Sequence, residues 1–257
     1  MKTLIAIVSC HTRPAYVKAL RELWIPHVPA SLEYKFFYGP STRTPELDEV
    51  FLDCDDSYQG LPSKVRAITR WALEHDFDFM LKCDDDVVLI PERFAASGYE
   101  KFDFVGNINR VFTTVTVPWG FCYTLSKRAM QTVAKAELPH GNNDEAWCAD
   151  LLYLQNIRLH KDFRYQLYAG RRESFVTVKK RPLRTPPRPE FIENLPLAQE
   201  IIAYCMFIHW VGYRELPEER NIEEMKKVFK EMTQSAGLVS VPVVLPRALR
   251  RPPRWRP

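Results

Sequence analysis

Short apolar runs alternate, along the first half of the chain, with segments in which apolar residues recur every three or four positions. The first run, at residues 4–8, is continuous and rich in β-branched residues, which is typical of a strand buried on both faces. Between residues 13 and 25 the apolar positions follow helical spacing, and Pro14 suits a first helical turn. The pattern therefore predicts a buried strand followed by a helix.

Further elements of both kinds are predicted along the chain. Further strands are predicted at residues 34–38, 50–52, 77–81, 104–106 and 121–125, and helices at residues 64–73, 127–136, 144–154 and 218–233. Strands that alternate with helices predict an α/β fold, with a mostly parallel sheet and helices on both faces. Ligands of such sheets bind at the carboxyl ends of the strands.

Composition is that of a soluble globular protein, with 46% hydrophobic and 26% charged residues among 257. No apolar run reaches the roughly 18 to 20 residues that a membrane-spanning helix needs. No small-residue cleavage site follows the first apolar stretch either. We therefore expect a cytoplasmic protein without a transmembrane segment. The six cysteines form no CxxC pair and indicate neither a zinc site nor a disulfide framework.

The net charge of +4 is unevenly spread. Residues 171–190 and residues 246–257 carry +5 each, which leaves −6 on the remaining chain. Such basic segments suit nucleotides, nucleic acid or an anionic membrane surface, and the alternative for the last dozen residues is a solvated tail. We expect one domain over residues 1–235, with an irregular Pro/Arg-rich loop at 179–190, and a basic tail over 236–257.

Three adjacent carboxylates, Asp84, Asp85 and Asp86, stand between two apolar stretches. They repel one another in a half-buried turn unless a positive charge offsets them. Asp84 and Asp86 alternate along the chain, so in extended backbone their side chains share a face, and oxygen ligands suit magnesium or manganese. Both are therefore candidate metal ligands. The alternative is a solvated acidic turn, which the apolar flanks disfavour.

Four motifs, in order, resemble those of the β-1,3-galactosyltransferase and fringe family over about residues 4–160. They are DCDDSYQGLPSK at 53–64 with a downstream Trp71, LKCDDDV at 81–87, GFCYTLS at 120–126 and NDEAW at 143–147. The sequence departs from the family where Gly60 and Pro62 replace Asn and Thr, where two glycines of the third motif are lost, and where the acidic pair is inverted. Donor and acceptor identity are therefore not carried over.

The resemblance implies the Rossmann-like GT-A fold and an inverting glycosyltransferase, which moves a hexose from a UDP-sugar to an acceptor hydroxyl. Asp84 and Asp86 would hold Mn²⁺ (or Mg²⁺) against the donor's diphosphate. Family members complete the coordination with a late histidine, and His209 is the best-placed candidate, with His160 as a fallback. A core role is the alternative for His209.

A carboxylate is needed to take the acceptor's proton. Glu145 aligns with the family's aspartate, its neighbour Asp144 is a second candidate, and helix capping is the alternative for both. The predicted donor-binding residues are Thr12, Arg13, Asp56, Lys64 and Asp85. Lys64 would place a cation beside the diphosphate. Trp119 and Gly120 are the acceptor candidates.

The expected acceptor is a glycan built in a microbial cytosol. Its main alternative is DNA with hydroxymethylated pyrimidines, which some bacteriophage enzymes glycosylate, and the basic segments would then bind phosphates. The same segments could instead contact a membrane peripherally. A metal-dependent phosphohydrolase or nuclease would need more carboxylates or histidines for a second ion. A binding protein that has lost catalysis is disfavoured because Asp84, Asp86 and Glu145 are all present.

Overall fold

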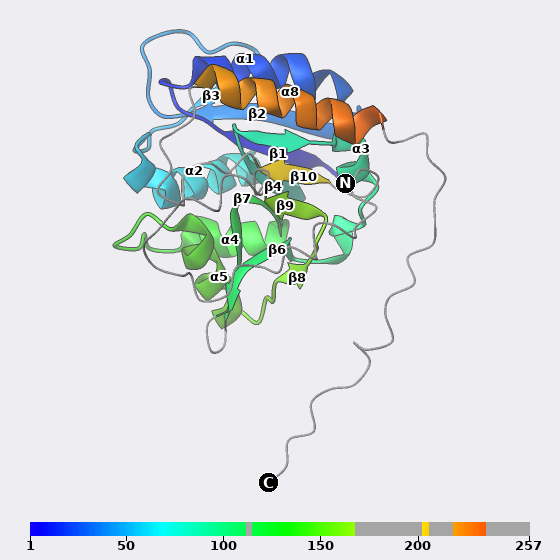
Figure 1. The fold of residues 1–257 in the computed structure, drawn as a ribbon. Helices are drawn as coiled ribbons and strands as arrows, with labels where there is room; N and C mark the ends of the chain where they lie inside the picture. The colour runs from blue at the N-terminus through cyan, green and yellow to red at the C-terminus, as the bar shows by residue number, and fades with distance from the viewer. Residues whose placement is uncertain (112–114, 168–201, 206–217, 235–257) are drawn as a thin grey trace, which may run out of the picture.

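The computed structural model describes residues 1–111, 115–167, 202–205 and 218–234 (Figure 1). Its strands are β1 (Thr3–Val8), β2 (Leu32–Tyr38), β3 (Glu49–Phe51), β4 (Phe79–Asp84), β5 (Val87–Leu89), β6 (Phe104–Val111), β7 (Thr116–Ser126), β8 (His160–Lys161), β9 (Tyr165–Leu167) and β10 (Ala203–Cys205). Its α-helices are α1 (Pro14–Leu23), α2 (Leu61–Glu74), α3 (Pro91–Ala95), α4 (Lys127–Lys135), α5 (Asp144–Leu154) and α8 (Glu218–Gln234). The predicted loop at 179–190, the tail at 236–257 and His209 lie outside these residues.

A seven-stranded sheet with the order β3-β2-β1-β4-β7-β6-β8 forms the centre of the fold. β1 pairs in parallel with β2 and β4, β2 with β3, and β6 with β8. Only β7 runs antiparallel within this described sheet, between β4 and β6. The prediction of a mostly parallel sheet flanked by helices is therefore confirmed.

Every residue of β1 is buried, which explains why its sequence does not alternate between apolar and polar residues. Ile5 and Ile7 belong to the core under α1 and α8, whereas Leu4, Ala6 and Val8 belong to the core under α2, α4 and α5. Figure 1 shows the two helical layers on opposite sides of the sheet. The helices thus cover both faces, as the sequence predicts.

α8, the last described helix, packs against α1, the first. It lies along α1 (Figure 1), with Met225 and Val228 in the core that they share. The side-chain amide of Asn221 donates a hydrogen bond of 2.8 Å to the Tyr16 hydroxyl. The helix predicted at 218–233 is confirmed, and it completes the cover of this face.

A second, three-stranded sheet with the order β5-β10-β9 was not predicted. Its β5 is the fully buried apolar stretch directly after the acidic cluster. The indole nitrogen of Trp24, at the end of α1, donates to the Val87 carbonyl at 3.0 Å. This bond fixes the strand that follows the acidic cluster to the helix that follows β1.

Two further expectations concern cysteines and membrane spans. Cys10, Cys54, Cys83, Cys122 and Cys148 are free thiols, and the last three are buried. No helix in the described part of the chain has the length and apolar character to cross a membrane.

We expect Trp24→Phe to lower the free energy of unfolding by about 2 kcal/mol, because it leaves the buried Val87 carbonyl without its donor. Urea unfolding followed by circular dichroism measures the loss. Lys18→Ala on the exposed side of the same helix is the control, with a change within about 0.5 kcal/mol. Equal stability of the two variants would contradict the anchoring role of Trp24.

Candidate functional site

Apart from His209, which lies outside the described residues, and the fallback His160, the predicted site residues gather at one edge of the large sheet. β1 and β4 end there together, with Val8 opposite Asp84. Antiparallel β7 enters at the same edge, since Cys122 lies opposite Cys83, and so brings in Gly120 two residues earlier. This is the edge at which parallel α/β sheets bind their ligands.

The aspartate turn consists of Asp84, the last residue of β4, and Asp85 and Asp86, which form the turn into β5. Asp84 and Asp86 were predicted to share a face of extended backbone. That premise is wrong, because the chain turns at Asp85. Asp85 is 3% exposed and accepts a hydrogen bond of 2.7 Å from the Ser9 hydroxyl. Its second oxygen lies 2.9 Å from the guanidinium of Arg13. Asp85, a predicted donor contact, is thus bound within the protein.

Burial raises the pKa of Asp84 to about 7, with Asp86 and Asp144 adding to the rise and Lys82 opposing it. Burial likewise raises the pKa of Asp85 to about 7, against the opposing charge of Arg13. An unfolded aspartate loses its proton near pH 4, so deprotonation of the folded turn costs stability as the pH rises from about 4 to 7. A further cation at the turn would offset that cost.

Arg13 supplies internal positive charge to the turn. Besides Asp85, its guanidinium approaches Asp86 to 3.4 Å, and it stacks over the Tyr16 ring with its carbon 4.1 Å from the ring centre. Burial lowers the pKa of Arg13, but Asp85 and Asp86 outweigh it and raise the value overall. Its Nε is buried without a hydrogen-bond partner. Arg13, which was predicted to contact the donor, is therefore an ion-pair partner of the aspartate turn.

The buried Lys64 and the half-buried Asp56 form an ion pair that ties three loops together. Lys64 is 2% exposed, and its ammonium donates to Asp56 Oδ1 and to the Ser9 carbonyl. Asp56 also accepts from the backbone N–H groups of Gly39, at 2.8 Å, and His11, at 3.4 Å. Lys64, predicted to lie beside a diphosphate, is instead held in the interior and fixes the loops that follow β1 and β2.

An aromatic group that the sequence did not single out lies at the ends of β1, β2 and β3. The exposed His11 ring stacks on Tyr38 with centroids 5.1 Å apart and meets the edge of Phe51 at 5.4 Å. Its Nε2 lies 3.1 Å from the Gly39 carbonyl. Thr12, the neighbouring predicted residue, is exposed. An aromatic residue near the carboxyl end of each strand is the signal that could have indicated this group.

Lys82 links the turn to β7 and α5. Its ammonium donates to Asp84 Oδ1 at 2.6 Å and to the Gly120 carbonyl at 2.5 Å, and it lies 3.8 Å from Asp144 Oδ2. Asp144 also accepts a hydrogen bond of 2.8 Å from the Tyr123 hydroxyl. At 2% exposure, Asp144 is a buried member of this network.

Glu145 lies beside the predicted acceptor residues. A methyl group on Gly120 would come within 2.9 Å of Glu145 Oε2, so a glycine lets this carboxylate lie against β7. Trp119 is half-buried, and its ring stacks on Phe121 with centroids 6.5 Å apart. The N-terminus of α5 is capped by Asn143, whose side chain accepts from the Ala146 N–H at 2.9 Å. The acidic pair therefore does not provide the cap.

The described residues contain no set of three His, Cys, Asp or Glu side chains gathered as a complete metal site. They contain the two predicted carboxylates, while His209 lies outside them. The fallback prediction that His160 is a metal ligand is wrong, because its strand β8 is separated from β4 by β7 and β6. Its exposed ring stacks on Phe102 instead, with centroids 3.4 Å apart.

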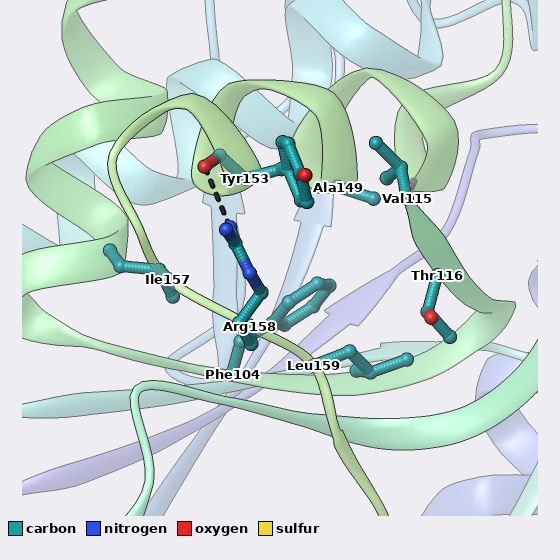
Figure 2. A pocket seen from close by; sticks show the side chains of 8 residues that line it. All are labelled: Phe104, Val115, Thr116, Ala149, Tyr153, Ile157, Arg158 and Leu159. Atoms are coloured by element: carbon teal, nitrogen blue, oxygen red, sulfur yellow. Dashed lines mark hydrogen bonds between the residues drawn. The ribbon is translucent and has the colours of Figure 1, made fainter. Parts of the chain in front are cut away.

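A separate hollow of about 60 Å³ lies between α5 and the large sheet (Figure 2). It is lined by Phe104, Val115, Thr116, Ala149, Tyr153, Ile157, Arg158 and Leu159. Arg158 donates to the Tyr153 carbonyl at 2.8 Å and stacks on that residue's ring. The volume is far below the roughly 300–1,000 Å³ of small-molecule sites, and no predicted site residue lines the hollow.

No family model matches the chain, and no curated protein is detectably similar to it in sequence. Solved structures share its fold. The apo form of the glycosyltransferase GlyE from Streptococcus pneumoniae TIGR4 superposes with a TM-score of 0.50 at 10% identity, over 92% of this chain and 64% of GlyE. A glycosyltransferase involved in glycosylation of the major capsid of PBCV-1 has a TM-score of 0.51 at 10% identity, over 88% of this chain and 100% of its own.

These likenesses, together with the sheet order, show that the chain has the GT-A fold. The chain spans less than two thirds of the length of GlyE. At this identity the likeness establishes the fold alone, and the resemblance to the β-1,3-galactosyltransferase and fringe family stays a prediction.

Lys64→Met should lower the free energy of unfolding by about 3 kcal/mol, because it leaves Asp56 and the Ser9 carbonyl without a buried cation. Lys226→Met is the matched control, since Lys226 pairs with Glu22 at 3.8 Å and both side chains are half exposed. That change should stay within about 0.5 kcal/mol. Denaturant unfolding of both variants checks the difference, and similar losses would show that the interior pair does not hold the loops.

Proposed function

We propose that this protein is a metal-dependent glycosyltransferase, which transfers a hexose from a UDP-sugar to a hydroxyl of a glycan with inversion. The observation that carries the proposal is that the aspartate turn and Glu145 meet at the carboxyl edge of a GT-A sheet. The two solved structures described above are named glycosyltransferases, which supports sugar transfer in general.

Asp84 and Asp86 are the residues that would hold Mn²⁺ or Mg²⁺. Their oxygen ligands suit a hard cation. Burial, with a smaller contribution from Asp86 and Asp144, raises the pKa of Asp84, and a bound cation would favour its charged form. The bound ion would act as a Lewis acid toward the departing diphosphate. Two carboxylates leave room in the coordination shell for diphosphate oxygens, and His209 stays the predicted third protein ligand.

The donor's base and ribose fit the loops that follow β1 and β2. His11 and Tyr38 offer flat aromatic surface, and Thr12 offers an exposed hydroxyl. Asp56 and Lys64 hold these two loops in place through their ion pair and its hydrogen bonds to the backbone. Arg13 and Asp85 keep the aspartate turn in place beside it. We assign these four residues to shaping the donor site.

Glu145 is the group we assign as general base. Asp144 is buried and accepts a hydrogen bond from Tyr123, so its oxygens face the interior. Glu145 is half-buried and lies against Gly120, at the rim of the same edge. An acceptor hydroxyl bound near Trp119 and Gly120 would present its proton to this carboxylate while the anomeric carbon gathers positive charge.

The competing functions lack support in the described residues. A two-metal nuclease or phosphohydrolase needs a larger ligand set, and none is gathered there. The basic segments that would favour a DNA acceptor or a membrane surface lie outside those residues. We therefore keep a glycan hydroxyl as the proposed acceptor and cytoplasm as the predicted location.

The decisive assay measures UDP release from a panel of UDP-sugars, with and without Mn²⁺. We expect Mn²⁺ to stimulate release, and Asp86→Ala to abolish the stimulation and weaken Mn²⁺–UDP binding by at least about 100-fold in calorimetry. The matched control is Asp150→Ala, an exposed aspartate on α5. Nuclease activity without turnover of any donor would overturn the proposal, and unchanged affinity in Asp86→Ala would remove the metal role.

Glu145→Gln should leave Mn²⁺–UDP affinity unchanged and lower kcat by about 10²- to 10⁴-fold, because the amide cannot take the acceptor's proton. Initial rates at saturating donor and acceptor measure the effect. Glu74→Gln, at an exposed position on α2, provides the control and should retain full activity. Full activity of Glu145→Gln would refute its assignment as base.

A further inference from the structure

Lys82 carries a charge in the interior, and the proposed reaction does not use it. It lies on β4 with 1% of its surface exposed, and its ammonium is 5.7 Å from the centre of the Tyr123 ring. Burying an ammonium is costly unless it is paired and hydrogen-bonded.

The partners of Lys82 come from three separate elements that build the site. They are Asp84 on its own strand, the Gly120 carbonyl on β7 and Asp144 on α5. Tyr123, the residue opposite Lys82 in the β4–β7 ladder, donates its hydroxyl to the same Asp144 oxygen. One ammonium and one hydroxyl thus tie the first turn of α5 to the aspartate turn.

We propose that Lys82 is a positioning residue, which sets the first turn of α5, and with it Glu145, against the aspartate turn. The catalytic consequence rests on the proposed function, whereas the link between Lys82 and Asp144 can be tested without it. Lys82 is enclosed and held by three partners, so it acts through them and does not contact a substrate.

Removal of the Lys82 ammonium affects the aspartate turn and the first turn of α5 together. The half-buried Asp84 and the buried Asp144 would be left as two carboxylates that repel each other without a cation between them, and Asp144 would be displaced. Glu145 would move with it, because it is the next residue on the same helical turn. The Gly120 carbonyl would lose its donor at the point where Glu145 packs against β7.

The first test compares the thermal unfolding of Lys82→Met, Asp144→Asn and the double variant. Lys82→Met should lower Tm by about 8 °C. The double variant should unfold at a higher temperature than Lys82→Met alone, because one of the two uncompensated carboxylates has been removed and the repulsion between them is lost. A double variant that unfolds below Lys82→Met would overturn the link between the two residues. This outcome does not depend on any enzymatic activity.

The second test separates positioning from simple support of the fold. Under assay conditions in which each variant is folded, the double variant should keep the donor KM within about threefold of the wild type and lose at least about tenfold in kcat. Tyr99→Phe, which removes a buried hydroxyl bond to Thr3 on another part of the sheet, controls for lost stability and should keep kcat. Wild-type kcat in the double variant would overturn the positioning role.

Tyr123→Phe covers the case in which neither Lys82 variant folds. It removes the hydroxyl bond to Asp144 and keeps the ring, so it should lower kcat by about tenfold with little change in donor KM. An unchanged kcat would count against the positioning network. If the wild type transfers no sugar at all, the proposed function fails, and the unfolding comparison still decides whether Lys82 and Asp144 are coupled.

Discussion

Carboxylates crowd one edge of the sheet, and three internal cations offset their charge. Each cation is enclosed or half-enclosed and holds a different loop. An unpaired buried charge costs far more than a surface one, so these pairs fix the loops that carry them. The pairs are Arg13 with Asp85 and Asp86, Lys64 with Asp56, and Lys82 with Asp84 and Asp144. These pairs set three cations against five carboxylates, and in the proposed enzyme the divalent ion would offset the negative charge that remains.

Much of the fold and the location of the site could be predicted from local patterns. The run at residues 4–8 and the helical spacing of α1 and α2 reflect burial on one or two faces, which a sequence displays directly. An acidic cluster directly after a buried strand likewise indicates a carboxyl edge. Asp84, Asp86 and Glu145 therefore lie in the region that the sequence indicated, although their roles are still predictions.

The remaining features depend on pairing between distant segments. The reversed direction of β7 leaves no mark on its apolar pattern, yet it brings Gly120 to the site. β9 and β10 are three residues long and find partners far along the chain, so no local signal marks them. The same limit explains Lys64, whose sequence position suggested a phosphate contact. Its actual partners, Asp56 and the Ser9 carbonyl, become visible only when the loops are assembled.

The packing of α8 on α1 has a consequence for the order in which the protein can mature. The helix that covers α1 is synthesised some two hundred residues after it. Until then its apolar side stays open to water or to other chains, a condition that favours aggregation and chaperone capture. Completion of this layer therefore depends on closure of a long loop as well as on local helix formation.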